Sequence, residues 1–407
     1  MKGPVPRLAA RPARRYRRAA LEPTYDIAVL GTTPAGCAAA CILAARRKQV
    51  ALLSCPAAAC ESPLCEWVPR AFWRLPGLPP SAAKDCGASP FRVVRYYSAD
   101  LAKRTQCVSR AKAGDLLRSA DLREVLLAAA KKAGAKIHSL PRRPAISLGE
   151  ESIRLPGSKP VWARLLLIAQ GRPADVLSDL SLPVRSPPDS RFAVAGLDVP
   201  LGPPRTGSAK PARPPDLAGA LHVVASRQRG RVGMFFLLRD TLHLRVLSPA
   251  GDRASLASAL SGMLADLRRA GIVPADLALS RAQGAVWTPP AGEALDLETH
   301  AAKRCLLCGT AGGFADSITG ATLLTSVRSA GVACEAALAS LAATGRPGSP
   351  ASDPQGALMR FRTDWREALA DGLRPPSTSL DVLLPLLFAN HRLAEKFTRA
   401  LLSGESI

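Results

Sequence analysis

The sequence predicts an α/β protein in which a three-layer domain with a parallel sheet is interrupted by a second, mostly antiparallel sheet. Three observations lead to this prediction. Between Tyr25 and Ser54 the chain reads as a strand, a glycine turn, an alanine-rich helix and a second strand. Another strand, glycine loop and long helix follow between Lys303 and Ser340. Residues 186–295 instead show strand-like runs with Arg and Gly at the turns, which is typical of antiparallel strands.

The composition is that of a globular protein large enough for two or more structural units. The 407 residues are 47% apolar and 21% charged, and no apolar run is long enough to span a membrane. The formal net charge of +23 is compatible with a nucleic acid or an anionic membrane as partner. No nucleic-acid-binding motif is found, so we interpret the charge as a bias toward arginine and expect no specific nucleic-acid partner.

The N-terminus and the cysteines indicate a cytoplasmic protein. Residues 1–23 read as a basic disordered tail, because no apolar stretch follows the basic run as a signal peptide requires. The ten cysteines show no even pairing, which favours reduced thiols over a disulfide framework. Cys55, Cys60, Cys65 and Cys86 are spaced too loosely for the C-x-x-C pairs of zinc sites, and no metal site is expected.

Periodicity and turn residues place the main elements along the chain. Strands are expected at 25–30, 49–53 and 164–169, and helices at 37–47 and 115–134. Residues 55–90 read as irregular, because they are rich in Pro, Ala and Cys. Residues 202–216 form a Pro-rich loop, and the segment from Ala357 to the C-terminus is helical.

The first glycine turn has the spacing of a dinucleotide-binding motif. Gly31, Thr33 and Gly36 stand on a G-x-G-x-x-G frame, with Thr33 in place of the second glycine. In such a turn the first glycine permits a tight bend, the second lets a pyrophosphate approach, and the third lets helix and strand pack closely. Pro34 suits the first helical turn, where its missing N–H has no helical partner. The free N–H groups of that helix then bind phosphate.

Most of the chain resembles the FAD-dependent oxidoreductases that include aromatic hydroxylases, geranylgeranyl reductases and tryptophan halogenases. The family's opening G-x-G-P-A-G is matched by GTTPAG at 31–36, and its closing G-D-A-A-G-F-x-D-P-x-T-G by GTAGGFADSITG at 309–320. Between them, a helical Arg is matched by Arg118 and a mid-chain Asp-Gly by Gln170-Gly171. The resemblance implies a Rossmann-like FAD-binding domain of the glutathione-reductase type, an inserted substrate domain of antiparallel strands, and C-terminal helices.

The resemblance also implies which residues bind FAD. They are Gly31, Thr33, Pro34, Ala35, Gly36, Ser54, Arg118, Gln170, Gly171, Gly309, Thr310, Ala311, Gly312, Gly313, Thr319 and Gly320. The start of the helix after Gly320 is expected to face a flavin carbonyl and to stabilise negative charge on the reduced ring. Three acids of the family are replaced, by Ser54, Gln170 and Thr310, and the loss of their charges weakens binding by about 2–4 kcal/mol.

The expected domain organisation follows from the two separated glycine motifs. Residues 24–185 form the first part of the FAD-binding domain, 186–295 the inserted substrate domain, and 296–345 the second part of the FAD-binding domain. Residues 346–407 form a linker and C-terminal helices. The leucine-rich C-terminal stretch is expected to pack on the protein's own core, and contact with a membrane surface is the alternative.

The function predicted from these motifs is that of an FAD-dependent oxidoreductase, monooxygenase- or reductase-like, on a small apolar or aromatic substrate. A halogenase is disfavoured because the five Trp residues do not form the W-x-W-x-I-P segment of that group. The electron donor stays open between a transiently bound NAD(P)H and another protein. No catalytic residue is identified, although His243 is the best placed of the histidines. The alternative function is a catalytically silent relative that uses the fold for binding.

Overall fold

The computed structural model describes most of the chain. The described residues are 25–56, 62–142, 144–156, 160–182, 192–201, 217–228, 230–249, 255–274, 277, 279–280, 282–343 and 353–405. The expected tail at 1–23 and the expected Pro-rich loop at 202–216 lie outside them, as does most of the expected linker after 345. None of the described helices is long and apolar enough to cross a membrane.

The first sheet has eight strands. Their bounds are β1 (Tyr25–Leu30), β2 (Val50–Ser54), β8 (Lys136–Ser139), β9 (Ser147–Leu148), β10 (Ile153–Leu155), β11 (Val161–Ile168), β17 (Ala301–Ala302) and β18 (Cys305–Leu307). The order is β17-β18-β11-β1-β2-β8, and β10 and β9 extend it beside β11. From β18 to β8 neighbouring strands run parallel, so their C-terminal ends share one edge.

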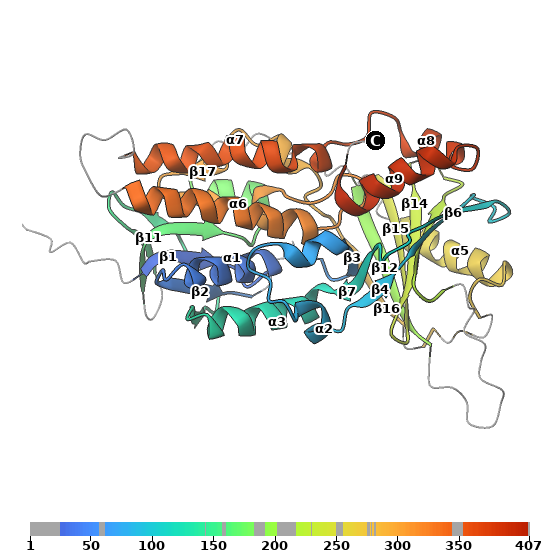
Figure 1. Cartoon of the computed structure of the whole chain (residues 1–407), viewed down its shortest axis with the longest axis horizontal. Coiled ribbons are helices and arrows are strands. Elements are labelled where there is room, and N and C mark those ends of the chain that lie inside the picture. Colours follow the sequence, from blue (N-terminus) through green and yellow to red (C-terminus); the bar gives the residue numbers. More distant parts are fainter. Residues whose placement is uncertain are drawn as a thin grey trace, which may run out of the picture.

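Helices cover one face of this sheet and form a layer beside it (Figure 1). They are α3 (Ser119–Lys132), α1 (Pro34–Ala45), α6 (Leu323–Ala342) and α7 (Pro354–Leu373). Alternate strand residues such as Ile27 and Val29 face these helices, whereas Ala28 and Leu30 face β10 and the short helix α4 (Pro173–Asp179). The small residues of α1 are buried on nearly every side, as expected for a helix enclosed by a sheet and two helices.

A second sheet of seven strands lies beside the first unit (Figure 1). Its strands are β5 (Val93–Tyr97), β6 (Arg104–Val108), β12 (Phe192–Pro200), β13 (Ala220–Ala225), β14 (Val232–Leu238), β15 (Thr241–Pro249) and β16 (Gln283–Trp287). Only the β13–β5 pair is parallel. Helix α5 (Leu256–Arg269) packs on one face, while α8 (Leu380–Leu386) and α9 (His391–Ser403) pack on the other.

A small three-stranded sheet joins the two larger units. It consists of β3 (Cys65–Pro69), β7 (Gly114–Arg118) and β4 (Ser89–Phe91), in the order β3-β7-β4. The 3-10 helix η1 (Arg70–Arg74) and the short helix α2 (Ala82–Asp85) lie between β3 and β4 in the chain. Leu64, Cys65 and Trp67 pack against the second sheet, whereas Val68 packs in the core of the first.

The structure corrects three expectations. Residues 115–118 belong to strand β7, so the helix predicted from 115 begins at Ser119; pairing with β3 and β4 overrides the helical pattern. The segment 55–90 contains two strands and two short helices rather than irregular chain. Strands β5 and β6, at 93–108, belong to the second sheet, although the sequence assigns them to the first part of the FAD-binding domain. Parallel pairing with β13 places them there, and no local pattern encodes such a pairing.

Candidate functional site

The turn between β1 and α1 requires glycine at its two ends. Gly31 has a φ of 111°, and a Cβ there would lie 2.3 Å from the Cβ of Gln170. A Cβ on Gly36 would lie 2.0 Å from the carbonyl oxygen of Gly31. Real atoms do not approach so closely, so both positions exclude any side chain. The sequence prediction of a tight strand-to-helix turn therefore has a steric basis.

Thr33, at the second position of the glycine motif, is the N-cap of α1. Its hydroxyl oxygen accepts a hydrogen bond from the Gly36 N–H at 3.1 Å and donates one to the Ala169 carbonyl at 3.3 Å. Pro34 follows in the first turn, where a proline costs no helical hydrogen bond. The replacement of glycine by threonine thus links the start of α1 to the end of β11.

The second glycine turn packs against the same place. The 3-10 helix η4 (Gly309–Gly312) follows β18, and a Cβ on Gly309 would lie 2.9 Å from the Ala169 carbonyl oxygen and 3.0 Å from the Ala35 Cβ. Gly313 has a φ of 78°, and Gly312 packs against the Phe314 ring. The three predicted segments at 31–36, 169–171 and 309–313 are therefore in mutual contact at the C-terminal edge of the parallel sheet.

A cavity of about 270 Å³ opens at this junction. Its lining comes from the β1–α1 turn, the start of α3, η4, the start of α6 and the chain before β3. The residues are Thr33, Pro34, Ala35, Ser62, Pro63, Ser119, Ala120, Arg123, Thr310, Thr322, Leu323 and Ser326. The carboxyl edge of a parallel sheet is where ligands of such folds bind. We call this space the turn cavity.

Two hydroxyl groups of the turn cavity lack partners. Thr310 Oγ1 and Ser119 Oγ are both buried, and neither has a hydrogen-bond partner within the described part of the chain. Buried polar atoms are almost always hydrogen-bonded, and leaving one unsatisfied costs about 1–3 kcal/mol. Both residues line the turn cavity, so a polar ligand bound there would give these hydroxyls a partner. Arg123, one turn along α3, adds a positive charge to the lining.

Other predicted residues lie outside the lining of the turn cavity. Ser54 ends β2, with its Oγ 3.5 Å from Thr32 Oγ1. Gln170 donates to the Pro56 carbonyl at 3.3 Å and accepts from the Cys55 thiol at 3.6 Å, so its side chain crosses from β11 to the chain after β2. The backbone at this edge is shaped by Gly171, which has a φ of 133°, and by Ala311, which is fully buried in η4.

Arg118 does not occupy the position that the resemblance implies. It is the exposed last residue of β7, not a helical residue, and it does not line the turn cavity. Arg123, five positions on, does. The helical pattern over 115–134 predicted the start of this helix one turn too early and so placed Arg118 within it. Sequence reasoning also missed Ser119, which carries no motif of its own.

Thr319 and Gly320 lie in a loop organised by a buried carboxylate. Asp316 Oδ1 accepts from Ile318 N at 3.0 Å, from Thr319 N at 2.7 Å and from Thr319 Oγ1 at 2.7 Å. Burial raises the pKa of Asp316 to about 6, against these hydrogen bonds, which lower it. Gly320 closes the loop with a φ of 70°.

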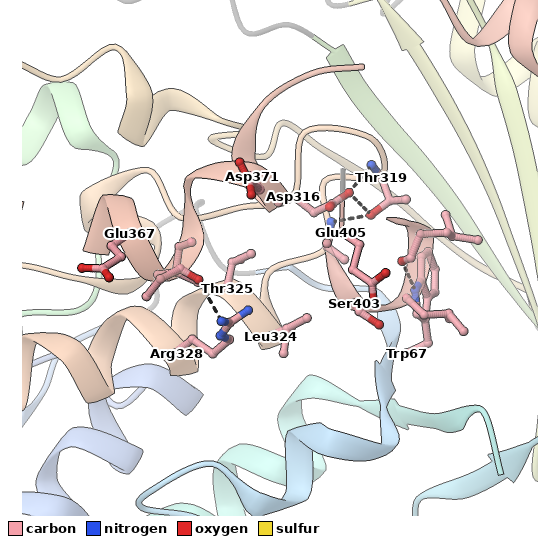
Figure 2. Close-up of a pocket in the computed structure, with 17 residues that line it drawn as sticks. Trp67, Asp316, Thr319, Leu324, Thr325, Arg328, Glu367, Asp371, Ser403 and Glu405 are labelled. Atoms are coloured by element: carbon pink, nitrogen blue, oxygen red, sulfur yellow. Dashed lines mark hydrogen bonds between the residues drawn. The ribbon is translucent and has the colours of Figure 1, made fainter. Parts of the chain in front are cut away.

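This loop borders a second cavity, of about 410 Å³, on another side of α6 (Figure 2). Asp316, Thr319 and Trp67 line it together with the C-terminal residues 401–405. Arg328 of α6 also lines it and donates to the Ala368 carbonyl of α7 at 2.8 Å. Thr319 therefore faces this cavity rather than the turn cavity.

The start of α6 is already occupied by a carboxylate of the chain. Glu66, fully buried in β3, accepts from Thr322 N at 2.8 Å, Leu323 N at 2.9 Å and Thr322 Oγ1 at 2.9 Å. A helix N-terminus attracts an anion because its first N–H groups lack partners. Glu66 supplies that anion here. The expectation that these N–H groups face a flavin carbonyl is corrected, and no sequence motif marked Glu66.

The fold is shared with solved flavoenzymes, although sequence comparison finds nothing. No protein-family model matches the chain, and no curated protein matches it in sequence. A geranylgeranyl bacteriochlorophyll reductase-like protein from Thermoplasma acidophilum is similar with a TM-score of 0.67 at 14% identity, over 94% of this chain and 97% of its own. PqsL, a probable FAD-dependent monooxygenase from Pseudomonas aeruginosa, gives 0.63 at 18% identity, over 92% and 99%.

A third similar structure is the flavin-dependent brominase Bmp2, with a TM-score of 0.64 at 14% identity over 93% of each chain. The chain therefore has the mixed α/β fold of FAD-dependent oxidoreductases, which confirms the resemblance inferred from its motifs at the level of fold. Reductase-like, brominating and monooxygenase proteins share this fold, so the fold by itself assigns no reaction to this chain.

Proposed function

We propose that this protein is an FAD-dependent oxidoreductase whose dinucleotide binds in the turn cavity. The observation that carries the proposal is the pair of buried, unpartnered hydroxyls, Thr310 Oγ1 and Ser119 Oγ, beside a turn in which Gly31 and Gly36 admit no side chain. The names of the structural neighbours, which are FAD- or flavin-dependent, support the choice of cofactor.

Part of the site fits FAD and part does not. The start of α1 and Arg123 would hold the phosphates, and Thr310 would bind a ribityl hydroxyl. Ser54 and Gln170 would bind at the adenosine end without the charge of the acids that they replace. At the start of α6 the N–H groups of Thr322 and Leu323 are not available to a flavin, because Glu66 accepts hydrogen bonds from both. The residues thus fit the phosphate and ribityl part of FAD.

The domain organisation that we propose follows the two larger sheets. The sheet around β1 and β11 belongs to a glutathione-reductase-type FAD-binding domain, assembled from 24–185 and 296–345. The seven-stranded sheet is the inserted substrate domain, expected at 186–295 and joined by β5 and β6. Bound FAD supplies hydride transfer or oxygen activation. This chain's residues bind and orient the FAD and exclude water from it.

The substrate class that we propose is a small apolar or aromatic molecule, converted by a monooxygenase- or reductase-like reaction. NAD(P)H that binds only transiently, or another protein, is the proposed electron donor. A structure of PqsL, one of the similar proteins, holds 2-aminobenzoylacetate, a small aromatic molecule, and this supports the substrate class.

FAD titration of the purified protein tests the proposal, because flavin absorbance and fluorescence report binding directly. We expect a yellow protein, or a colourless one that takes up added FAD. Thr310→Val should weaken FAD binding by about tenfold while raising the stability of the cofactor-free protein, because it removes an unsatisfied buried hydroxyl.

Thr325→Val is the matched control, since Thr325 Oγ1 donates to the Phe314 carbonyl at 2.9 Å. It should lower stability and leave FAD affinity unchanged. A colourless protein that takes up no FAD would refute the proposal and favour the catalytically silent binding protein.

A further inference from the structure

Three titratable side chains from separate parts of the chain meet between β3 and the seven-stranded sheet. Cys65 Sγ lies 3.6 Å from His243 Nε2, and His243 Nδ1 lies 2.7 Å from Asp198 Oδ1. Asp198 on β12 and His243 on β15 are directly paired residues of neighbouring antiparallel strands. Cys65 and His243 are only 3% and 4% exposed. The order thiol, imidazole, carboxylate matches the arrangement that activates a nucleophile.

The hydrogen bonds define one consistent protonation state. Burial raises the pKa of Cys65 to about 12. The negative charge of Asp198 raises this pKa further, and that of Asp121 does so to a smaller extent. The positive charges of Arg245 and Arg118 lower it. The resting group is therefore a thiol, whose S–H donates to His243 Nε2. His243 then carries its proton on Nδ1 and donates it to the Asp198 carboxylate. Each proton of the chain Cys65–His243–Asp198 has one acceptor.

Cys65, His243 and Asp198 are of the residue types that bind metal ions, and their ligand atoms lie close together. Their orientation, however, argues against a metal site. The thiol and the carboxylate approach opposite ring nitrogens of His243, so one ion could not bind all three in these positions. A structural zinc site needs four ligands. The cationic side chain of Arg245 also acts electrostatically on Cys65, and it would repel a second cation.

Arg245, two residues along β15 from His243, carries an unused hydrogen-bond donor, and its charge acts on Cys65. Its guanidinium lies over the rings of Trp67 and Phe236, with the guanidinium carbon 5.3 Å and 5.8 Å from the ring centroids. The side chain is 3% exposed, and Nη2 has no hydrogen-bond partner among the described residues. A buried N–H without a partner is a place for the oxygen atom of a ligand. The burial of Cys65 restricts that ligand to a small molecule.

We propose that Cys65 is a peroxide-reactive thiol, with His243 as proton carrier, Asp198 as the group that orients His243, and Arg245 as donor to a peroxide oxygen. The thiol proton moves to His243 Nε2 while Sγ attacks one oxygen of hydrogen peroxide. The S–O bond forms, the O–O bond breaks, and the departing hydroxide takes the proton from His243. The products are cysteine sulfenic acid and water. Sulfur loses two electrons and the peroxide gains them.

Peptide-level mass spectrometry of the native full chain tests this proposal, because the other cysteines are internal controls. The protein is exposed briefly to hydrogen peroxide, catalase removes the excess, and the chain is then unfolded in urea with dimedone, so that sulfenic acids at buried and exposed cysteines are trapped alike. Cys55 and Cys107 are more exposed than Cys65. We expect Cys65 to be labelled faster than either, by about tenfold or more. Labelling in the order of exposure, with Cys65 last, overturns the proposal, as does zinc bound at Cys65 in the purified protein.

Two substitutions test the roles of the neighbours. Asp198→Asn and His243→Gln should slow oxidation of Cys65 by about 10- to 100-fold, while Cys107 keeps its rate. In the wild type the Cys65 rate should depend less on pH than in His243→Gln, because His243 takes the thiol proton.

In His243→Gln the rate should rise with pH, by about tenfold per unit, because the thiolate must form by loss of its proton to solvent. A pH profile that is the same in both proteins overturns the role of His243. If a variant unfolds, the oxidation of all its cysteines is accelerated together, which distinguishes unfolding from a local effect on Cys65. Arg245→Lys keeps the positive charge and tests Arg245 as the hydrogen-bond donor to peroxide; it should slow the oxidation of Cys65 alone.

Discussion

Helices α1 and α6 both direct their N-termini toward the turn cavity, and the two ends differ in how their N–H groups are satisfied. At α1 the partners are local: Thr33 caps the Gly36 N–H, and Pro34 has none to offer. At α6 a carboxylate from β3, Glu66, binds the first N–H groups. The α1 end therefore keeps its positive field for a ligand, whereas the α6 end is neutralised within the protein.

The comparison shows that the same structural element can be a ligand site or a completed internal contact. The decisive factor is a single side chain from elsewhere in the chain. An anionic ligand in the turn cavity is therefore directed to α1 and Arg123, and the unpartnered Thr310 and Ser119 lie where such a ligand would need donors. Four predictions test this difference between the two helix ends and the turns that they support.

The largest change in unfolding free energy is expected when the pH is lowered, through His300, which supports the η4 turn. His300 Nε2 donates to the Gly312 carbonyl at 3.0 Å, and Nδ1 is buried without a partner in the described chain. Burial lowers the pKa of His300 to about 3, from an ordinary value of 6.5. The stability that neutral His300 contributes is fully present above about pH 6.5 and is lost as the pH falls toward 3. The loss is on the order of 5 kcal/mol.

Urea unfolding at pH 7 and pH 4 measures this effect. His300→Gln should reduce the difference in unfolding free energy between the two pH values, and the exposed His391→Gln should leave it unchanged. An equal pH dependence in wild type and His300→Gln would contradict the argument.

Removing the anion from the α6 end should be nearly as costly. Glu66→Ala leaves three donors unsatisfied and the buried charge of Arg245 without its nearby carboxylate, so we expect a loss of about 3–5 kcal/mol in unfolding free energy. Glu66→Gln keeps the shape and should lose only about 1–3 kcal/mol. Equal and small losses for both variants, measured by chemical denaturation, would show that Glu66 does not complete the helix end.

A glycine in each helix gives a matched pair. Gly36→Ala in α1 places a Cβ against the Gly31 carbonyl and should destabilise the protein by about 1–3 kcal/mol or more. Gly331→Ala in α6 meets no atom within 4 Å and should stabilise it by about 0.5–1 kcal/mol, the usual gain in a helix interior. Thermal unfolding of the two variants should shift in opposite directions. A shift in the same direction would disprove the close contact at the β1–α1 turn.

The smallest effect on stability is expected at Thr33. Thr33→Gly restores the glycine spacing of the turn and loses a cap, which costs only a few tenths of a kcal/mol when glycine replaces threonine. The removed side chain leaves room for a phosphate, so FAD affinity should rise several-fold in the same titration that tests the proposed function. Weaker FAD binding would mean that Thr33 itself binds the ligand.

The features that depend on local geometry could be predicted from the amino-acid sequence. Gly31, Gly36, Gly309 and Gly313 were identified because tight turns and close packing exclude side chains, and that requirement is visible in a few consecutive residues. The same local logic predicted β1, α1 and β2 within a few residues of their bounds. That the two glycine turns, far apart in the chain, lie in contact is shown by the tertiary structure.

The side chains that fill the space around those turns could not be predicted, because they come from distant parts of the chain. Glu66 reaches α6 across 256 positions, and Cys65 reaches His243 across 178. Neither pair leaves a periodic or spaced signal, because the contact arises from the packing of β3 between two sheets. Strand β7 was read as helix for the same reason: its pairing partners lie elsewhere in the chain. Turn geometry is encoded locally, whereas the satisfaction of a buried charge depends on which distant side chain the fold brings beside it.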